Sequence, residues 1–256
     1  MREKRIVIKI GSSSLVKDGK VNKQFIAELA REVAALKTRG YSVCVVTSGA
    51  IALGVGKLGL AEKPEAIEGK QACAAIGQSL LMRQYESIMD IYGLRCAQLL
   101  LTHEDFDRES SSTHLYNTVC ALFSYGVIPI INENDATSVD EIKVGDNDTL
   151  GALTAILIKA DSYVIVSDVE GLYTANPNEK GAELIAEVKE ITEDIKAKAQ
   201  GHGNLGTGGM ATKLNAGTLV TEVGADMYII HNRKIDHLSA LLAGAKIGTK
   251  FCAKKR

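Results

Sequence analysis

Short apolar runs that alternate with longer amphipathic segments constrain the fold of this chain more than any other feature of its sequence. Most of these runs are rich in β-branched residues and apolar at nearly every position, which is typical of strands buried on both faces. Strands separated by helices predict a mostly parallel sheet covered on both sides, a three-layer α/β/α sandwich. The predicted strands are 5–10 (RIVIKI), 41–46 (YSVCVV), 95–101 (RCAQLLL), 127–131 (VIPII), 163–166 (YVIV) and 227–230 (MYII).

The segments between these runs have helical spacing and helical end signals. The clearest one lies between Asn22, a residue type that caps helices, and Gly40, a residue type that ends them. Its apolar residues recur at intervals of three and four and therefore share one face: Phe25, Ile26, Leu29, Val33 and Leu36. Further helices are expected over residues 68–92, in the segment that ends at Tyr125-Gly126, and over 150–159 and 211–223.

The chain has 256 residues, 46% of them hydrophobic, which is enough for a large buried core. The sequence contains no Pro/Ser-rich linker, no internal repeat and no low-complexity segment. We therefore expect one domain over residues 1–256. Within it we expect an N-terminal lobe of about 1–158 and a C-terminal lobe of about 159–256.

The charge balance excludes some classes of partner. The chain carries 30 basic and 31 acidic residues, a formal net charge of −1, so nothing in its charge points to a nucleic acid or a membrane as partner. No apolar stretch approaches the roughly 18 residues that span a bilayer, and the N-terminus enters a strand without a secretory signal. We expect a cytoplasmic protein.

Several common cofactor motifs are absent or misleading. The five cysteines show no C-x-x-C spacing and the five histidines no metal-ligand spacing, so we expect reduced, mostly buried thiols and surface or capping histidines. No P-loop string occurs. Residues 54–59 (GVGKLG) match the dinucleotide pattern, but they do not directly follow a strand and they lead into 61–64 (AEKP), so NAD binding is not expected.

Polar, glycine-rich segments follow four of the predicted strands. They are 9–14 (KIGSSS), 47–50 (TSGA), 132–135 (NEND) and 167–173 (SDVEGLY). Each alone could be an ordinary turn. In a parallel sheet, however, the carboxyl ends of the strands meet at one edge, where ligands bind. The four segments together predict a ligand site at that edge.

Two of the glycine-rich segments suit phosphate groups. Residues 11–13 (GSS) offer small side chains and exposed backbone N–H groups, and Lys9 before them is a compact charge suited to phosphoryl oxygens. The loop 201–210 (GHGNLGTGGM) leads into a predicted helix with Lys213 in its first turn, so its amides and the helix N-terminus would form an anion site. A solvent-facing Lys9 and a merely flexible loop are the alternatives.

The most distinctive stretch is 132–148 (NENDATSVDEIKVGDND). It looks too polar for the core and too long for a turn, and long loops in compact domains tend to be functional. Its last residues meet the start of a helix. Capping of that helix is expected to account for one of Asp146, Asn147 and Asp148, which leaves the others for a ligand.

Five strings together resemble the amino acid kinase family, and within it the glutamate 5-kinases. The strings are KIGSSSL (9–15), TSGAIALG (47–54), INENDATSVDEIKVGDND (131–148), VSDVEGLYTANP (166–177) and GTGGMATK (206–213). The third and fifth are specific to the glutamate enzymes. The KIGSS and SD-x-x-GLY patterns are shared with kinases of carbamate, acetylglutamate, aspartate and UMP. Many glutamate 5-kinases carry a C-terminal PUA domain, and the chain resembles a form without it.

The resemblance implies site residues at the matching positions. It implies catalytic roles for Lys9, Lys213 and Asp148, with Asp148 orienting both lysines. It implies glutamate binding by Ser48, Gly49, Asp135, Asp146 and Asn147, with the acidic groups meeting the substrate ammonium. It implies ATP binding by Lys9, Gly11, Ser12, Ser167, Asp168, Thr207, Gly208, Gly209, Met210, Ala211, Thr212 and Lys213. No protein metal ligand is expected, because Mg²⁺ is carried by the nucleotide phosphates.

The implied reaction is ATP-dependent phosphorylation of the side-chain carboxylate of L-glutamate to L-glutamyl 5-phosphate, the first step of proline biosynthesis. That carboxylate is ionised at neutral pH, so no general base is needed, which agrees with the absence of a nucleophile–histidine pattern. The resemblance also implies ATP and Mg²⁺ as cofactors, L-proline as feedback inhibitor, a homo-oligomer, and transfer of the product to a glutamyl phosphate reductase.

Two other readings remain open from the sequence. One is another family member, such as an acetylglutamate or UMP kinase. The acid-rich loop disfavours it, because those substrates lack the free ammonium of glutamate. The other is a non-catalytic amino-acid-sensing module, which would have no need of Lys9, Asp148 and Lys213 together.

Overall fold

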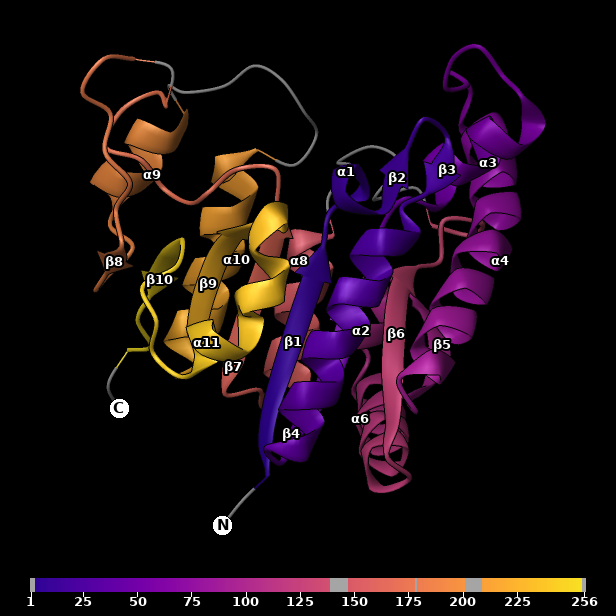
Figure 1. The fold of residues 1–256 in the computed structure, drawn as a ribbon, viewed down its shortest axis with the longest axis horizontal. Coiled ribbons are helices and arrows are strands. Elements are labelled where there is room, and N and C mark those ends of the chain that lie inside the picture. The colour runs from indigo at the N-terminus through magenta and orange to yellow at the C-terminus, as the bar shows by residue number, and fades with distance from the viewer. Residues whose placement is uncertain (1–2, 139–146, 178, 201–208, 255–256) are drawn as a thin grey trace.

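The computed structural model describes residues 3–138, 147–177, 179–200 and 209–254. An eight-stranded sheet forms its centre, in the order β5-β6-β4-β1-β7-β9-β10-β8 (Figure 1). Neighbouring strands are parallel except β9 and β10. The strands are β1 Lys4–Ile10, β4 Tyr41–Val46, β5 Arg95–Leu101, β6 Val127–Glu133, β7 Ser162–Ser167, β8 Glu187–Val188, β9 Asp226–His231 and β10 Thr249–Phe251. A small hairpin, β2 Val16–Lys17 and β3 Lys20–Val21, stands apart from this sheet.

Helices cover both faces of the sheet, so the predicted three-layer α/β/α sandwich is confirmed (Figure 1). One face is covered by α2 Lys23–Thr38, α4 Ile67–Ile91, the 3-10 helix η1 Asn232–His237 and α11 Leu238–Leu242. The other face is covered by α6 Glu109–Ser124, α8 Asp148–Leu157 and α10 Met210–Glu222. The remaining helices are α1 Ser12–Leu15, α3 Ala50–Leu58, α5 Glu104–Asp107 and α9 Glu193–Gln200.

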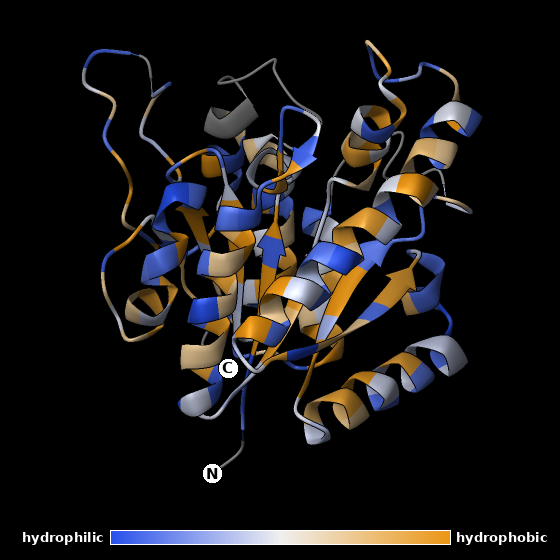
Figure 2. Cartoon of the chain, turned by 45° about the vertical axis from the view of Figure 1, so that its right-hand side comes forward, coloured by the Kyte–Doolittle hydropathy of each residue, from blue (hydrophilic) through white to orange (hydrophobic). Residues whose placement is uncertain are grey.

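Strand β1 shows why its sequence is apolar at consecutive positions. Ile6, Ile8 and Ile10 pack on the α2 side of the sheet, whereas Val7 packs on the α8 side. Side chains of a strand point alternately to the two faces, so a strand in the middle of a covered sheet must be apolar on both. The hydropathy colouring shows the result, with hydrophobic strands enclosed between helices whose outer faces are polar (Figure 2).

Helix α2 forms as its sequence pattern predicts. Its cap is Asn22, whose Oδ1 accepts a hydrogen bond of 3.3 Å from the backbone N–H of Phe25. All five of its predicted apolar positions are buried. The chain leaves the helix through Gly40, whose φ of +81° lies in the left-handed region that glycine adopts without strain.

Gly54, the first glycine of the segment that resembles a dinucleotide motif, has a packing role. Gly54 lies inside α3, and a Cβ on it would lie 1.9 Å from the carbonyl oxygen of Cys73 on α4. A Cβ on Gly77 of α4 would likewise lie 1.7 Å from the carbonyl oxygen of Ala50. The two helices therefore approach backbone to backbone, and any side chain at these positions would separate them.

Strand pairing brings the polar segments to one edge of the sheet. Lys9 pairs with Val46 on one side and with Ile165 on the other, and Val46 pairs in turn with Ile131. The carboxyl ends of β1, β4, β6 and β7 consequently lie at the same level. In Figure 1 this is the upper edge, where β1 meets α1, while the N-terminus lies at the lower edge.

One expectation about the stretch 132–148 is wrong, and the expectation of a capping residue is tested only for Asn147 and Asp148. Strand β6 continues two residues beyond Ile131, so Asn132 and Glu133 belong to the sheet and are buried. Asp135, Asn147 and Asp148 are buried as well, so these polar residues are part of the core. Helix α8 begins at Asp148, yet no side chain hydrogen bond caps it at Asn147. Both side chains are used elsewhere, and Asp146 lies outside the described residues.

The cysteine and histidine predictions are partly confirmed. All five cysteines are free thiols, but only Cys44 and Cys73 are buried. His231 caps η1 by accepting from the backbone N–H of Arg233, and His114 and His237 are exposed. Within the described part of the chain, no helix combines the length and the hydropathy that crossing a bilayer requires.

Candidate functional site

Three charged side chains from three elements meet at the upper edge of the sheet. Nζ of Lys9, near the end of β1, lies 2.5 Å from Oδ1 of Asp148 at the start of α8. Nζ of Lys213, in the first turn of α10, lies 3.0 Å from Oδ2 of the same carboxylate. All three are buried, with Asp148 completely so. A solvent-facing Lys9 is therefore excluded.

The two lysines keep Asp148 ionised despite its burial. Burial raises the pKa of a carboxyl group, but the charges of Lys9 and Lys213 outweigh that cost and lower the pKa of Asp148 to about 2. The cluster thus carries one negative and two positive charges, a net charge of +1. A buried positive charge at the carboxyl edge of a parallel sheet is suited to an anion such as a phosphoryl group.

Neighbouring groups hold the Asp148 carboxylate and its backbone in place. The hydroxyl of Thr212 lies 3.3 Å from Oδ2, and the hydroxyl of Tyr163 donates a hydrogen bond of 2.8 Å to the Asp148 carbonyl. The phenol of Tyr163 occupies the position next to Gly151, where a Cβ would lie 2.4 Å from its oxygen. Strand β7 and helix α10 therefore both fix the start of α8.

Asn147 connects the ends of β4 and β6. Its amide nitrogen lies 2.7 Å from the carbonyl oxygen of Thr47, 3.0 Å from Oγ of Ser48 and 2.9 Å from Oδ1 of Asn132. Its Oδ1 is buried and has no hydrogen-bond partner among the described residues. An unsatisfied buried acceptor costs free energy unless a ligand completes it.

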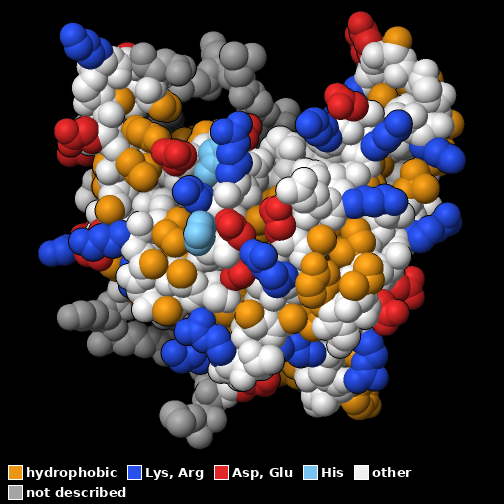
Figure 3. All heavy atoms as spheres, in the orientation of Figure 1, with side chains coloured by type: hydrophobic (Ala, Val, Ile, Leu, Met, Phe, Trp, Pro, Cys, Tyr) orange, Lys and Arg blue, Asp and Glu red, His pale blue; other side chains and the backbone are white. Residues whose placement is uncertain are grey.

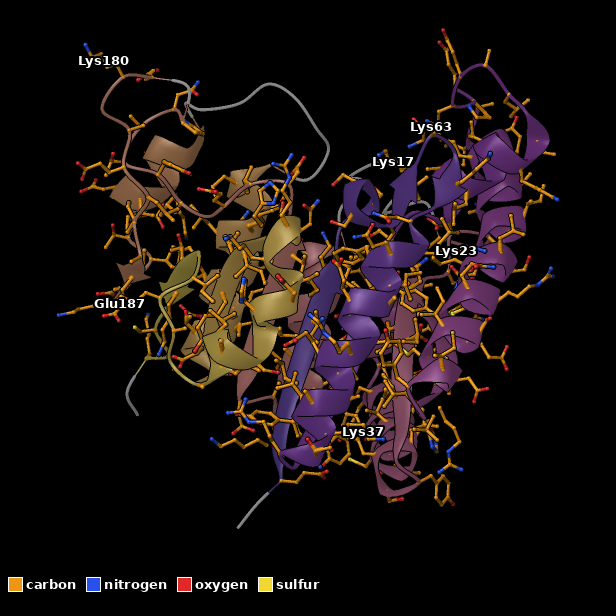
Figure 4. The ribbon with its side chains drawn as sticks, viewed as in Figure 1. Lys17, Lys23, Lys37, Lys63, Lys180 and Glu187 are labelled. Atoms are coloured by element: carbon orange, nitrogen blue, oxygen red, sulfur yellow. The ribbon has the colours of Figure 1, made fainter. Side chains whose placement is uncertain are left out.

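A cleft of about 550 Å³ begins at Gly49, the residue after Ser48. Ser12, Asp18, Gly49, Lys63 and Asp135 are among the residues that line it. Gly49 has a φ of +98°, where other residues are strained, and it begins α3. Figure 3 shows a notch in the upper edge whose right-hand wall is the α3–α4 region, and Figure 4 shows Lys17 and Lys63 near the hairpin β2–β3 on that side.

Most of the residues expected to contact the nucleotide lie at the ends of β1 and β7 and the start of α10, whereas Ser12 lines the cleft together with Gly49 and Asp135. Ser167 is the buried last residue of β7, and its hydroxyl lies 3.1 Å from Oδ1 of the exposed Asp168. Gly209 precedes α10, and Met210, Ala211 and Thr212 form its first turn. Gly11 joins β1 to β7 by donating its N–H to the carbonyl of Val166. Thr207 and Gly208 lie outside the described residues.

Two residues that support this site were not predicted from the sequence. Gln78 and Tyr85 extend from α4, and Tyr85 contacts Thr47 at the end of β4. A usable signal existed for Gln78: it is a polar residue on a helix face whose other members are small or apolar, namely Cys73, Ala74, Gly77, Leu81, Tyr85 and Ile88. Within residues 3–138, 147–177, 179–200 and 209–254, no three His, Cys, Asp or Glu side chains are grouped as metal ligands.

Comparison with known proteins identifies relatives of the whole chain. A glutamate 5-kinase from Clostridium tetani is 49% identical over 98% of this chain and 96% of its own length. The enzyme of the same name from Carboxydothermus hydrogenoformans is 45% identical over 99% of this chain, but only 69% of its own length is matched. A carbamate kinase from Giardia lamblia bound to AMP-PNP shares the fold, with a TM-score of 0.69 at 17% identity, covering 97% of this chain and 98% of that one. A family model described as the amino acid kinase family matches residues 4–231, and the chain belongs to that family.

Proposed function

We propose that this chain transfers the γ-phosphoryl group of ATP to the side-chain carboxylate of L-glutamate, forming L-glutamyl 5-phosphate. The observation that carries this function is the buried Lys9–Asp148–Lys213 cluster beside a cleft that contains Asp135. Relatives that match nearly the full chain at 45–49% identity carry the name of that activity. An acetylglutamate kinase, a UMP kinase or a sensing module is not favoured by these relatives.

In this mechanism the protein supplies alignment and charge rather than a base. The glutamate carboxylate is ionised near neutral pH and can attack phosphorus directly. Lys9 is assigned to the transferring phosphoryl group and Lys213 to the leaving β-phosphate side. Asp148 holds the two ammonium groups close together in spite of their mutual repulsion. Preorganised charges of this kind stabilise the spread of negative charge in the transition state.

The proposed nucleotide site combines small residues with free backbone amides. Helix α10 has 13 residues and begins after Gly209, which has no side chain to cap it; the first N–H groups of an α-helix have no partner inside the helix and suit phosphate oxygens. Gly11, Ser167 and Asp168 follow or end β1 and β7, and Ser12, also assigned to the nucleotide, lines the cleft beside Gly49. Mg²⁺, bound to the nucleotide phosphates, would neutralise part of their charge.

The amino acid site is assigned to Ser48, Gly49, Asp135 and Asn147, together with Asp146 outside the described residues. Asp135 and the amide oxygen of Asn147 supply negative or partially negative groups for the α-ammonium. We propose that these residues form an amino-acid-binding N-terminal lobe of about 1–158 and that Ser167 to Lys213 belong to a nucleotide-binding C-terminal lobe of about 159–256. Phosphoryl transfer would then take place at the junction of the two lobes.

The direct test is a hydroxamate assay for acyl phosphate with ATP, Mg²⁺ and L-glutamate. Glutamate-dependent hydroxamate is expected. L-Aspartate should be a much poorer substrate, because the missing methylene withdraws its carboxylate from the γ-phosphate. Equal turnover of the two acids would contradict the substrate, and binding of glutamate without turnover would favour a sensor. N-acetylglutamate and UMP serve as the remaining acceptors to compare.

Asn147→Ala should weaken amino acid binding while sparing ATP. Losing a buried partner of a charged ligand costs about 2–5 kcal/mol, so the glutamate KM should rise at least tenfold. L-Proline has the same α-ammonium and carboxylate, and we propose that it inhibits by competing at this site. Its inhibitory concentration should rise in parallel with the glutamate KM. A change confined to the ATP KM would contradict the placement of Asn147.

Three further properties extend this proposal. Acyl phosphates hydrolyse readily, so direct transfer of the product to a glutamyl phosphate reductase is expected. We propose a homo-oligomer in the cytoplasm, in keeping with free thiols at all five cysteines. Size-exclusion chromatography with light scattering measures the oligomeric state.

A further inference from the structure

A chain of side-chain amides runs from the edge strand of the sheet to Asn147. Nε2 of Gln78 on α4 lies 2.9 Å from Oε1 of Gln98 on β5, and Oε1 of Gln78 lies 2.8 Å from Nδ2 of Asn132 on β6. Oδ1 of Asn132 then lies 2.9 Å from Nδ2 of Asn147. Asn132, Asn147 and Gln78 are buried, whereas Gln98 is exposed at the sheet edge.

Backbone groups at two points favour one donor-to-acceptor direction for this series of amide hydrogen bonds. The backbone N–H of Glu133 can only donate, and it lies 3.0 Å from Oδ1 of Asn132. The carbonyl of Thr47 can only accept, and it lies 2.7 Å from Nδ2 of Asn147. An amide group has its acceptor on one side and its donors on the other. Asn132 must therefore present Nδ2 to Gln78, and position 78 must supply an acceptor there.

The orientation of Asn147 decides which of its atoms a ligand meets. The two hydrogens of its Nδ2 are shared among the Thr47 carbonyl, Oγ of Ser48 and Oδ1 of Asn132. Oδ1 remains as a buried acceptor without a partner among the described residues. The two backbone bonds favour this orientation, but without an acceptor at position 78 it would leave Nδ2 of Asn132 as an unpaired buried donor, which is costly. If Asn132 turned over to avoid that cost, its donor group would face the Asn147 nitrogen and favour the opposite orientation. Asn147 would then present hydrogen-bond donors to a ligand ammonium, which repel it.

We infer that Gln78 is a positioning residue for amino acid binding: by accepting from Asn132 it holds the Asn147 amide with Oδ1 toward the α-ammonium of glutamate. The inference rests on the proposed function and adds a residue that contacts neither substrate. Helix α4 reinforces it at a second point seven residues later, where the hydroxyl of Tyr85 lies 3.0 Å from the hydroxyl of Thr47. The side-chain amide of the exposed Gln98 can turn over, so it can offer a donor or an acceptor to the side chain at position 78.

Three substitutions at position 78 separate this role from simple packing. Gln78→Glu keeps an acceptor, Gln78→Met has a similar length without one, and Gln78→Lys supplies donors only. The charged side chains can reach solvent beside the exposed Gln98. Gln84→Met is the matched control, because Gln84 is a half-buried glutamine on the same helix with no contact to the site. Each protein is measured for KM of glutamate and ATP, for kcat, for glutamate binding by calorimetry and for Tm.

The expected pattern follows acceptor capacity and not size. Gln78→Met and Gln78→Lys should raise the glutamate KM and Kd by about tenfold, the value of a hydrogen bond to a charged group, with kcat and ATP KM little changed. Gln78→Glu and the Gln84→Met control should stay within about threefold of wild type. If Gln78 served only to pack α4 against the sheet, the reverse is expected: Gln78→Met would keep glutamate affinity and Gln78→Glu would lower it.

Two outcomes would overturn the inference. One is a Gln78→Met protein with unchanged glutamate affinity. The other is a Gln78→Glu protein as weak in glutamate binding as Gln78→Lys, a comparison that remains decisive if Gln78→Met fails to fold. Wild-type glutamate turnover tests the proposed function separately. A wrong proposed function is therefore distinguishable from a wrong role for Gln78.

Discussion

Replacing Lys213 with alanine is expected to lower kcat by about 10²–10³ while changing the glutamate KM little. Removing one preorganised electrostatic contact to a transition state typically has this effect, about 2.7–4 kcal/mol. An interaction made mainly in the transition state appears in kcat rather than in KM. Lys9→Ala should behave in the same way. Arginine should rescue neither position well, because a planar fork differs from a compact ammonium in a buried site.

The control for these variants is Lys23→Ala. Lys23 is exposed at the start of α2 near the same edge of the molecule, so it tests the loss of a positive charge without the loss of a buried contact (Figure 4). Steady-state kinetics with saturating ATP and varied glutamate give the result. A folded Lys213→Ala protein with near-normal kcat would show that Lys213 is not part of the catalytic machinery.

Asp148→Asn is expected to affect both catalysis and stability. It leaves Lys9 and Lys213 as two buried positive charges with no anion between them, and breaking a buried ion pair by removing one partner costs about 3–5 kcal/mol. The kcat should fall too, because the two lysines lose the carboxylate that positions them. Urea unfolding at pH 7 measures the stability. Glu104→Gln is the control, because its pair with Arg108 is exposed and should contribute at most about 1 kcal/mol.

The stability difference between wild type and Asp148→Asn should depend on pH. Burial raises the pKa of Asp148, but Lys9 and Lys213 lower it further, to about 2, below the roughly 3.9 of an unfolded aspartate. The unfolded state therefore binds the proton first, so the contribution of Asp148 is complete above about pH 4 and is lost as the pH falls toward 2. The difference from the asparagine variant should narrow over that window. A stability difference that stays constant from pH 4 to pH 2 would contradict an ionised Asp148 in the folded protein.

Much of the architecture follows from local sequence patterns. Strand β4 and strand β5 have the predicted bounds, and α2 begins directly after its cap Asn22 and ends before Gly40 as expected. These elements were predictable because their signals are local: apolar periodicity, a cap and a glycine stop act over a few residues. The family resemblance likewise indicated Lys9, Asp148 and Lys213, which the structure brings together, since whole strings such as GTGGMATK are contiguous in the chain.

The polar core at the site was not predictable in the same way. Asn132 and Glu133 were expected in a loop, because polar residues usually end a buried strand. Their burial is possible only because partners distant in sequence satisfy them: Gln78 is 54 residues before Asn132, and Ser138 donates to the Glu133 carboxylate. Periodicity records which face a side chain occupies but not which distant group will neutralise it.

The sequence alone therefore indicated the alternation of six strands with helices, the edge of the sheet at which the polar segments gather, and the chemical types of the residues gathered there. The tertiary structure decided what those residues do to one another. Asp148 is 139 residues from Lys9 and 65 from Lys213, and only strand pairing and the docking of α8 and α10 bring the three together. The strength of a charge pair and the direction of an amide depend on distance and burial, which arise when the sheet and its helices assemble.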